Sequence, residues 1–154
     1  MITIARIDER LIHGQVAYAW AVSCKSQIIM AVDNEISKDA FQISLLEMAC
    51  PTGTKCLVVN EDKAVRFLQN NEKKKFFLVV KHPITLLHLI EKGIKLESIN
   101  VGGLYFKEGR KQLTKTVYVD DEMISIFKKL NTYQVKLETR ATPSDALNDL
   151  MKLL

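Results

Sequence analysis

Apolar residues follow two alternating patterns along this chain. Short, mostly apolar runs of strand length alternate with segments in which apolar residues recur every three or four positions, as they do on one face of a helix. The predicted strands lie, in chain order, at 2–7, 28–32, 56–59, 76–80, 99–101, 117–119 and 135–137. This alternation predicts an α/β domain with a mostly parallel central sheet and helices on both faces.

Capping residues, proline and glycine mark the ends of the predicted helices. Pro83 suits the first turn of a helix and Gly93 the position just after its end. The helix predicted after the cap Ser37 carries three apolar residues on one face, namely Phe41, Leu45 and Met48. The last predicted helix follows Thr142-Pro143 and buries a stripe made of Leu147, Leu150, Met151 and Leu154.

Residues 102–116 form a polar, glycine-punctuated stretch without periodicity. It is too long for a tight turn, and loops of this kind tend to be functional or mobile. It begins in Val101-Gly102-Gly103, which lacks the glycine spacing of nucleotide-binding loops. We interpret these glycines as a turn at the mouth of the sheet, facing the candidate site.

The composition is that of an ordinary soluble globular protein, with 47% hydrophobic and 26% charged residues. The length of 154 residues predicts one domain, 1–154, and the net charge of +4 is too small to indicate a nucleic-acid partner. Without a signal peptide or an apolar run long enough to span a membrane, the chain is expected to be cytoplasmic. Its three cysteines include no CxxC pair and fit reduced thiols better than a disulfide framework.

The strongest chemical signal is the segment Arg6-Ile7-Asp8-Glu9-Arg10-Leu11-Ile12-His13-Gly14-Gln15-Val16, which joins the first strand to the first helix. His13 therefore stands at the carboxyl end of a parallel strand, where ligands and reacting groups gather in α/β domains. A neutral imidazole is nucleophilic and can carry a covalent group at cytoplasmic pH.

The neighbours of His13 suit a phosphoryl group. Unpaired N–H donors at the helix start favour a phosphate-like anion, and they belong to Gly14, Gln15 and Val16. Arg10 adds a positive charge and a forked donor, while Asp8 can hydrogen-bond one imidazole nitrogen and so select the nitrogen that reacts. The set predicts a phosphohistidine site in which His13, Arg10 and Asp8 are catalytic and the three amides bind phosphate.

Other interpretations stay open from the residues alone. A histidine between arginine and aspartate also occurs in surface ion-pair clusters, and the same loop would serve a non-catalytic α/β module that binds a small anion or a protein. His82 and His88 lie six positions apart across Pro83, on no common helix face. No carboxylate or thiolate cluster completes a set of ligands with them, so no metal site is predicted.

Two stretches resemble one protein family. Residues 6–16 are similar to the phosphorylation-site segment of the IIB components of the mannose/fructose/sorbose family of the bacterial phosphoenolpyruvate-dependent sugar phosphotransferase system. The family's other recurrent stretch resembles Asn100-Val-Gly-Gly-Leu-Tyr-Phe-Lys-Glu-Gly-Arg-Lys-Gln, residues 100–112. The order of helices and strands between them is also similar, so the resemblance covers essentially the whole chain.

The resemblance implies a fold and a function. The expected fold is a three-layer α/β/α domain with about seven strands and one antiparallel edge strand, for which we choose the alternating strand near Val135. The expected activity is that of a protein-N(pi)-phosphohistidine–sugar phosphotransferase. Nδ1 of His13 would accept a phosphoryl group from a phosphohistidine on a separate IIA protein and pass it to a sugar held by the membrane components IIC and IID.

The same resemblance bears on partners and cofactors. The sugar would be mannose, fructose, sorbose or an amino sugar. No cofactor, metal or nucleotide is needed, because proteins hold both donor and acceptor. The chain would contact the inner face of the cell membrane only through IIC and IID.

Overall fold

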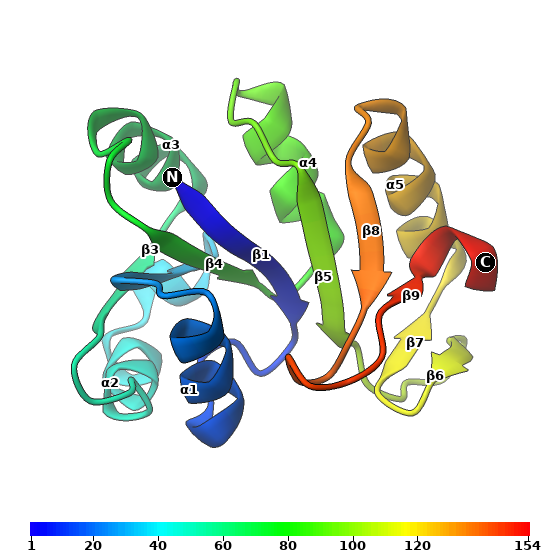
Figure 1. Ribbon diagram of the computed structural model, residues 1–154, viewed down its shortest axis with the longest axis horizontal. Helices are drawn as coiled ribbons and strands as arrows, with labels where there is room; N and C mark the ends of the chain where they lie inside the picture. Colours follow the sequence, from blue (N-terminus) through cyan, green and yellow to red (C-terminus); the bar gives the residue numbers. More distant parts are fainter.

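The computed structural model describes residues 1–154 and confirms the predicted α/β architecture (Figure 1). The sheet has seven strands, which are β1 (Ile2–Asp8), β2 (Ile28–Val32), β3 (Lys55–Val59), β4 (Phe76–Val80), β5 (Ser98–Gly103), β8 (Lys136–Thr139) and β9 (Asn148–Asp149). Their order is β3-β2-β4-β1-β5-β8-β9, and all neighbours are parallel except β8 and β9. The first strand of the chain therefore lies in the middle of the sheet.

The helices form a layer on each face of this sheet. They are α1 (Gly14–Ser23), α2 (Ala40–Met48), α3 (Glu61–Asn70), α4 (Pro83–Glu91) and α5 (Asp121–Thr132), with short 3₁₀ turns at Ile36–Lys38 and Leu150–Leu153. Successive residues of a strand point to opposite faces, so Phe76 and Leu78 join one apolar cluster and Phe77 joins the other. The larger cluster contains residues of α3, α4 and α5, whereas α1 and α2 contribute to the smaller one. The predicted three-layer arrangement is confirmed.

The caps follow the sequence in most places. Pro83 occupies the first turn of α4, and Gly93, at φ +98°, follows its end. Asp120 caps α5 by accepting a hydrogen bond from the Met123 N–H at 2.8 Å. The predicted cap Ser37 is wrong: it lies in the 3₁₀ turn, and Asp39 caps α2 instead.

The apolar face predicted for α2 exists but does not face the core. Phe41 is 72% exposed, Leu45 50% and Met48 82%. The helix instead packs through Leu46 and the following Ala49, which are partly buried against the smaller cluster. Leu46 and Ala49 thus anchor the helix, and Phe41, Leu45 and Met48 point away from the core.

The end of the chain departs from the prediction in two ways. The strand near Val135, β8, is parallel to β5, and the antiparallel edge is the two-residue β9. The helix predicted after Thr142-Pro143 is absent, because Asn148 and Asp149 pair with β8 before a 3₁₀ turn begins. Leu150 is nevertheless buried as predicted, whereas Leu147 is 61% exposed.

The stretch 102–116 is more regular than predicted. It contains β6 (Lys111–Thr114), which forms an antiparallel two-stranded sheet with β7 (Val117–Val119), apart from the main sheet in Figure 1. The predicted strand 117–119 is thus confirmed, but as half of this hairpin. Only residues 104–110 connect β5 to it.

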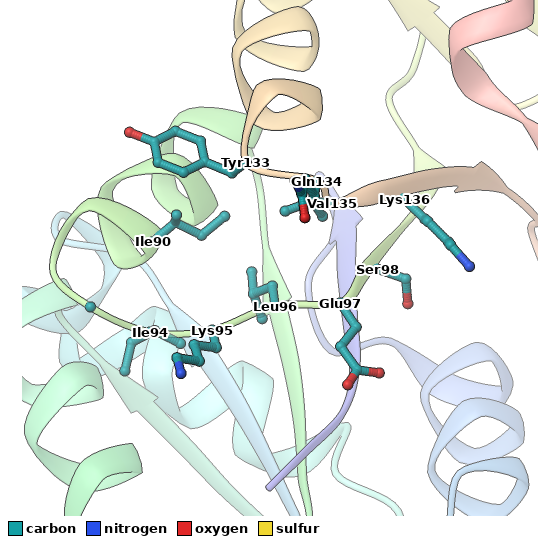
Figure 2. A pocket seen from close by; sticks show the side chains of 11 residues that line it. Ile90, Ile94, Lys95, Leu96, Glu97, Ser98, Tyr133, Gln134, Val135 and Lys136 are labelled. Atoms are coloured by element: carbon teal, nitrogen blue, oxygen red, sulfur yellow. The ribbon is translucent and has the colours of Figure 1, made fainter.

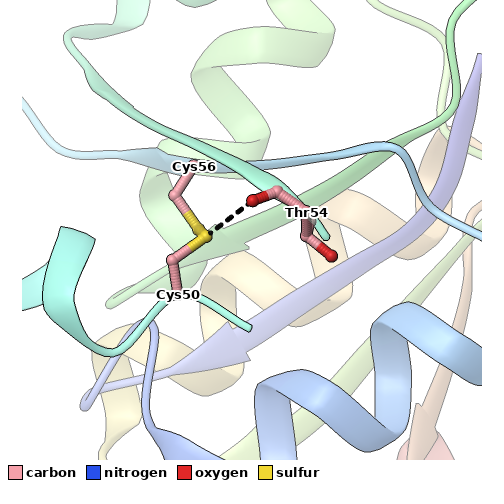
Figure 3. Close-up of a disulfide and its surroundings, with 3 residues drawn as sticks. All are labelled: Cys50, Thr54 and Cys56. Atoms are coloured by element: carbon pink, nitrogen blue, oxygen red, sulfur yellow. Dashed lines mark hydrogen bonds between the residues drawn. A yellow bond between two sulfur atoms is a disulfide. The ribbon is translucent and has the colours of Figure 1, made fainter. Parts of the chain in front are cut away.

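The expectation of three reduced thiols is wrong for two of them. Cys50 and Cys56 form a disulfide (Figure 3). Cys24 is free. The turn at Pro51–Thr54, closed by the Thr54 N–H donating to the Pro51 carbonyl at 3.1 Å, reverses the chain after α2. It brings the Cα atoms of the two cysteines to 6.0 Å. This proximity depends on the turn, and the sequence contains no CxxC motif that would predict it.

Candidate functional site

His13 lies where β1 passes into α1, at the carboxyl edge of the sheet. A turn follows Asp8, closed by the Leu11 N–H donating to the Asp8 carbonyl at 2.9 Å. Leu11, at φ +56°, is buried in the smaller apolar cluster and anchors the turn. His13 is the N-cap of α1 in extended conformation, and its side chain makes no capping hydrogen bond. The imidazole is therefore free to turn toward the strand end.

Asp8 and His13 are in direct contact. Nε2 of His13 lies 2.8 Å from Oδ2 of Asp8, a carboxylate with no exposed surface. An ionised carboxylate only accepts hydrogen bonds, so the ring proton of neutral His13 belongs on Nε2. Nδ1 then carries the lone pair, and no group of the protein bonds to it.

Arg6, a buried residue of β1, binds the same carboxylate. Its Nη2 and Nε donate to Oδ2 of Asp8 at 3.0 and 3.3 Å, and its side chain is only 3% exposed. Arg6 and Asp8 lie two positions apart on β1, so both side chains leave the strand on the same face. This period-of-two relation is the sequence signal that our prediction did not use.

The electrostatics keep Asp8 ionised. Burial alone raises the pKa of its carboxyl, but the hydrogen bond from His13, the charge of Arg6 and the Arg10 N–H together lower the pKa below its ordinary value. The Arg10 N–H donates to the second oxygen, Oδ1, at 3.0 Å. Asp8 is thus a fixed negative charge that positions the ring.

Gly102 and Gly103 make room for this pair. A Cβ on Gly102 would collide with the Arg6 guanidinium, and one on Gly103 would come within 2.6 Å of Oδ1 of Asp8. Real Cβ atoms do not approach other atoms so closely. The two glycines face the site as predicted. Because they have no side chain, they leave room for the buried charges of Arg6 and Asp8, and this explains glycine at these positions more specifically than a turn does.

Arg10 and Tyr105 stand at the outer side of Asp8. The Tyr105 hydroxyl lies 3.5 Å from Oδ1 of Asp8, and burial together with the Asp8 charge raises the pKa of Tyr105 although Arg10 nearby lowers it. The Arg10 side chain is exposed and has no carboxylate partner. Its guanidinium is therefore available to an incoming anion.

Glu9 fastens the loop 104–110 to the same turn. It accepts the Tyr105 N–H at 2.7 Å and pairs with Arg110 at 2.6 Å, whose side chain is 7% exposed. Arg110 also donates to the Tyr105 carbonyl at 2.7 Å. This loop, which we predicted to be functional or mobile, is tied to the residue next to Asp8.

The predicted phosphate donors lie where α1 begins. Gly14, Gln15 and Val16 occupy its first turn, so no earlier helical carbonyl accepts from their N–H groups. Gly14 and Gln15 are exposed, and Gly14 has φ +41°. The side chain of Val16 instead packs against the smaller apolar cluster. The structure thus brings Asp8, His13 and the helix start together, with Arg10 at the rim.

One large hollow lies far from His13, and the other two histidines make contacts of their own. A hollow of about 780 Å³, lined by residues such as Ile94, Leu96 and Tyr133, opens at the amino ends of β5 and β8, the edge opposite His13 (Figure 2). His82 caps α4 by accepting the Ile84 N–H, and His88 contacts Glu61. No group of three or more His, Cys, Asp or Glu residues is placed to hold a metal ion. None of the helices has the length and apolarity that crossing a membrane requires.

Comparison with known proteins gives concordant results. Residues 2–154 match the family described as the sorbose subfamily IIB component of the PTS system. A sorbose-specific EIIB component from Lacticaseibacillus casei is 35% identical over 98% of this chain and 93% of its own. The mannose-specific EIIAB component of Escherichia coli K12 is 37% identical over the whole chain, which spans 48% of that longer protein.

A solved structure has nearly the same fold. The crystal structure of the IIBSor domain of the sorbose permease from Klebsiella pneumoniae superposes with a TM-score of 0.95 at 34% identity. The match covers 99% of this chain and 95% of that one.

Proposed function

The chain belongs to the sorbose subfamily of IIB components of the sugar phosphotransferase system, and we propose that residues 1–154 act as one phosphocarrier unit with His13 as the phosphorylated residue. IIB components of this system are phosphotransferases. The observation that carries the proposal is the 2.8 Å contact of Nε2 with Asp8, which leaves Nδ1 as the nucleophile.

In the first half-reaction, the Nδ1 lone pair of His13 attacks the phosphorus of a phosphohistidine on a IIA protein. A new N–P bond forms as the donor's N–P bond breaks, and that electron pair returns to the donor imidazole. The proton on Nε2 stays hydrogen-bonded to Asp8, so no general base is required. The Asp8 carboxylate offsets the positive charge that develops on the ring.

Fixed donors stabilise the transferring group. The amides of Gly14, Gln15 and Val16 meet the phosphoryl oxygens at the positive end of α1, and Arg10 supplies a mobile charge. Phosphoryl transfer passes through a loose transition state, for which positioning and charge stabilisation are the main requirements. The amides and Arg10 offset the negative charge of the phosphoryl group, and we propose no cofactor for the step.

In the second half-reaction, a sugar hydroxyl attacks the phosphorus on His13. The N–P bond breaks, its electron pair returns to Nδ1, and the hydroxyl proton passes to a base outside this chain. We propose that membrane components IIC and IID present the sugar, and that the chain works in the cytoplasm against the inner membrane face. Relatives are named for sorbose, mannose, fructose and N-acetylgalactosamine, and we propose that the sugar is mannose, fructose, sorbose or an amino sugar.

The test is phosphorylation by phosphoenolpyruvate through the general phosphotransferase proteins and a mannose-type IIA, comparing the native chain with His13→Ala. We expect one phosphate per native chain, labile in acid and stable in base, and none on the variant. His88→Ala is the matched control and should be phosphorylated normally.

Two results would contradict the proposal. Full phosphorylation of His13→Ala would move the site to another residue. Saturable binding of the charged IIA without any covalent phosphate would favour the non-catalytic binding module instead.

A further inference from the structure

Two successive carbonyls just after β8 receive hydrogen bonds from two distant parts of the site. The Arg140 carbonyl accepts from Nη1 of Arg6 at 3.1 Å. The next carbonyl, that of Ala141, accepts from Nε1 of Trp20 at 3.2 Å. The Arg6 and Arg140 guanidinium carbons lie 5.6 and 5.1 Å from the centre of the Trp20 ring. A segment more than a hundred residues away in sequence therefore joins β1 to α1.

These two connections reach the two partners of one hydrogen bond. Arg6 grips Oδ2 of Asp8, the acceptor. Trp20 lies two turns into α1, the helix that begins directly after His13, and is 2% exposed. The positions of Asp8 and His13 thus both depend on the same short piece of backbone, the carbonyls of Arg140 and Ala141. A shift of that piece changes the alignment of the imidazole with the carboxylate.

A row of side chains across three strands supports the segment. Arg6, Asn100 and Glu138 are register partners on β1, β5 and β8, and all three are buried. Nη1 of Arg6 donates to Asn100 at 2.6 Å, and Nδ2 of Asn100 donates to Glu138 at 3.2 Å. Glu138 holds the Arg140 guanidinium at 2.9 Å, and Nδ2 of Asn100 also donates to the Arg140 carbonyl at 3.1 Å.

Every member of this row is buried and paired. A buried polar network with all its partners satisfied restricts each member to one position, whereas a loosely paired one would allow several. The side chain of Trp20, which extends from α1, fills the space against the guanidinium groups of Arg6 and Arg140. An apolar residue of similar size would fill that space without fixing the Ala141 carbonyl.

We propose that Trp20 and Arg140 are positioning residues for phosphoryl transfer, which hold His13 and Asp8 in register through the carbonyls of Arg140 and Ala141. This inference rests on the proposed function of His13. Neither residue touches the reacting atoms. Their effect is to keep the ring proton on Nε2 and the nucleophilic Nδ1 in place.

The decisive variant is Trp20→Phe, which keeps an aromatic ring and removes the Nε1 donor. In single turnovers at saturating phosphorylated IIA, we expect the rate of transfer to His13 to fall about tenfold, a part of the roughly hundredfold that a misplacement of about 1 Å costs. The concentration of phosphorylated IIA that gives half of this rate should stay within about twofold. Nitrogen-detected NMR of the unphosphorylated chain should show a smaller share of the His13 ring with its proton on Nε2.

Arg140→Lys provides a second variant, because it keeps the charge near Glu138 but loses the planar group over Trp20. It should lower the single-turnover rate less than Trp20→Phe does, with the same shift of the ring proton. Phe67→Leu is the control: Phe67 packs edge-on against Phe76, with ring centres 5.9 Å apart, in the cluster on the other face of the sheet. It should lower the melting temperature without changing the single-turnover rate or the ring proton.

The inference is overturned if Trp20→Phe loses stability as Phe67→Leu does but keeps the native single-turnover rate and ring proton. The NMR measurement needs no phosphoryl donor. A native chain that is never phosphorylated would therefore count against the proposed function, while the ring proton would still decide whether Trp20 positions His13.

Discussion

The protein contains two histidine–carboxylate pairs, and they differ in the part of a helix on which the histidine stands. His13 contacts Asp8 at 2.8 Å, and His88 contacts Glu61 at 2.9 Å. Both carboxylates are buried or nearly so. The distance and the burial of the carboxylate alone would not tell the two pairs apart.

Their surroundings distinguish them. His13 precedes the first turn of α1, where N–H groups point outward, whereas His88 lies in the last turn of α4, where carbonyls do. The first environment attracts a phosphoryl group and the second repels one. The free nitrogens differ too, since Asp8 leaves Nδ1 of His13 and Glu61 leaves Nε2 of His88.

The partners of the two carboxylates also differ. Asp8 is shared with a buried arginine, Arg6, while Glu61 is shared with Asn34 and the partly exposed Lys92. The comparison shows why the proposed phosphate-accepting site is the histidine–carboxylate contact that a helix start and fixed donors adjoin. Elsewhere the same contact joins α3 to α4.

The largest expected effect follows from Asp8→Asn. An amide can donate to Nε2 and move the ring proton to Nδ1, which blocks the nucleophile. We expect the rate of transfer from phosphorylated IIA to fall about 10²- to 10⁴-fold, as when a histidine is held in the wrong tautomer. Rapid-quench single-turnover measurements test this, with Glu61→Gln as the same chemical change at the other pair. Equal losses in both variants would remove the distinction between the pairs.

Acid unfolding gives a second prediction for Asp8. Its pKa is lower in the folded chain than the ordinary 3.8, so its carboxylate stabilises the fold above that pH and the contribution is lost as the pH falls through the folded-state pKa. Chemical denaturation across pH should therefore show native and Asp8→Asn stabilities converging at the acid end. A constant difference at all pH values would mean that the Asp8 charge does not contribute.

Gly102→Ala should disturb the site from the side of β5. The added Cβ collides with the Arg6 guanidinium, which we expect to cost about 1–3 kcal/mol of unfolding free energy and to slow transfer. Gly53→Ala adds the same atom in open space at φ +85°, so it should cost stability without slowing transfer. Thermal unfolding and transfer rates separate the two. Unchanged transfer in Gly102→Ala would show that Arg6 can move without consequence.

Arg10→Ala should have a smaller effect, because this side chain is exposed and has no carboxylate to hold it. We expect transfer to slow about tenfold, or about 1.4 kcal/mol in the barrier, with the melting temperature unchanged. Arg10→Lys should recover part of the rate. If the alanine variant transfers at the native rate, the amides of α1 alone stabilise the phosphoryl group.

His88→Ala should have the smallest effect. The pair is partly exposed, and Glu61 keeps its contacts with Lys92 and Asn34, so stability should change by less than about 1 kcal/mol. Phosphorylation should be that of the native chain. A loss of phosphate here would show that the histidine at the end of α4 takes part in transfer.

The local sequence was sufficient for much of the fold and for the centre of the site. Buried strands such as β2 and β4 are continuous apolar runs, and Pro83 marks the start of α4. The structure brings Asp8 and His13 together as predicted, because both belong to one short connection. Assigning them roles in transfer stays a prediction.

What the sequence could not supply depends on long-range pairing. Asn100, Glu138 and Arg140 join the site only through strand order and register, and no spacing within the chain indicates that order. The disulfide and β9 have the same origin, since each depends on where a turn returns the chain. The face of α2 was misjudged because periodicity shows which residues share a face, and not which way that face points.

The central place of β1 sets the time at which this site forms in the cell. Gly103 and the Arg140 carbonyl, which complete the surroundings of His13, are made 90 and 127 residues after it. At about 5–20 residues per second, translation delivers Arg140 roughly 6 to 25 seconds after His13. A nascent or prematurely terminated chain thus displays His13, Asp8 and Arg6 without the later strands that bury the two charges, and the proposed phosphate acceptance would be a property of finished molecules.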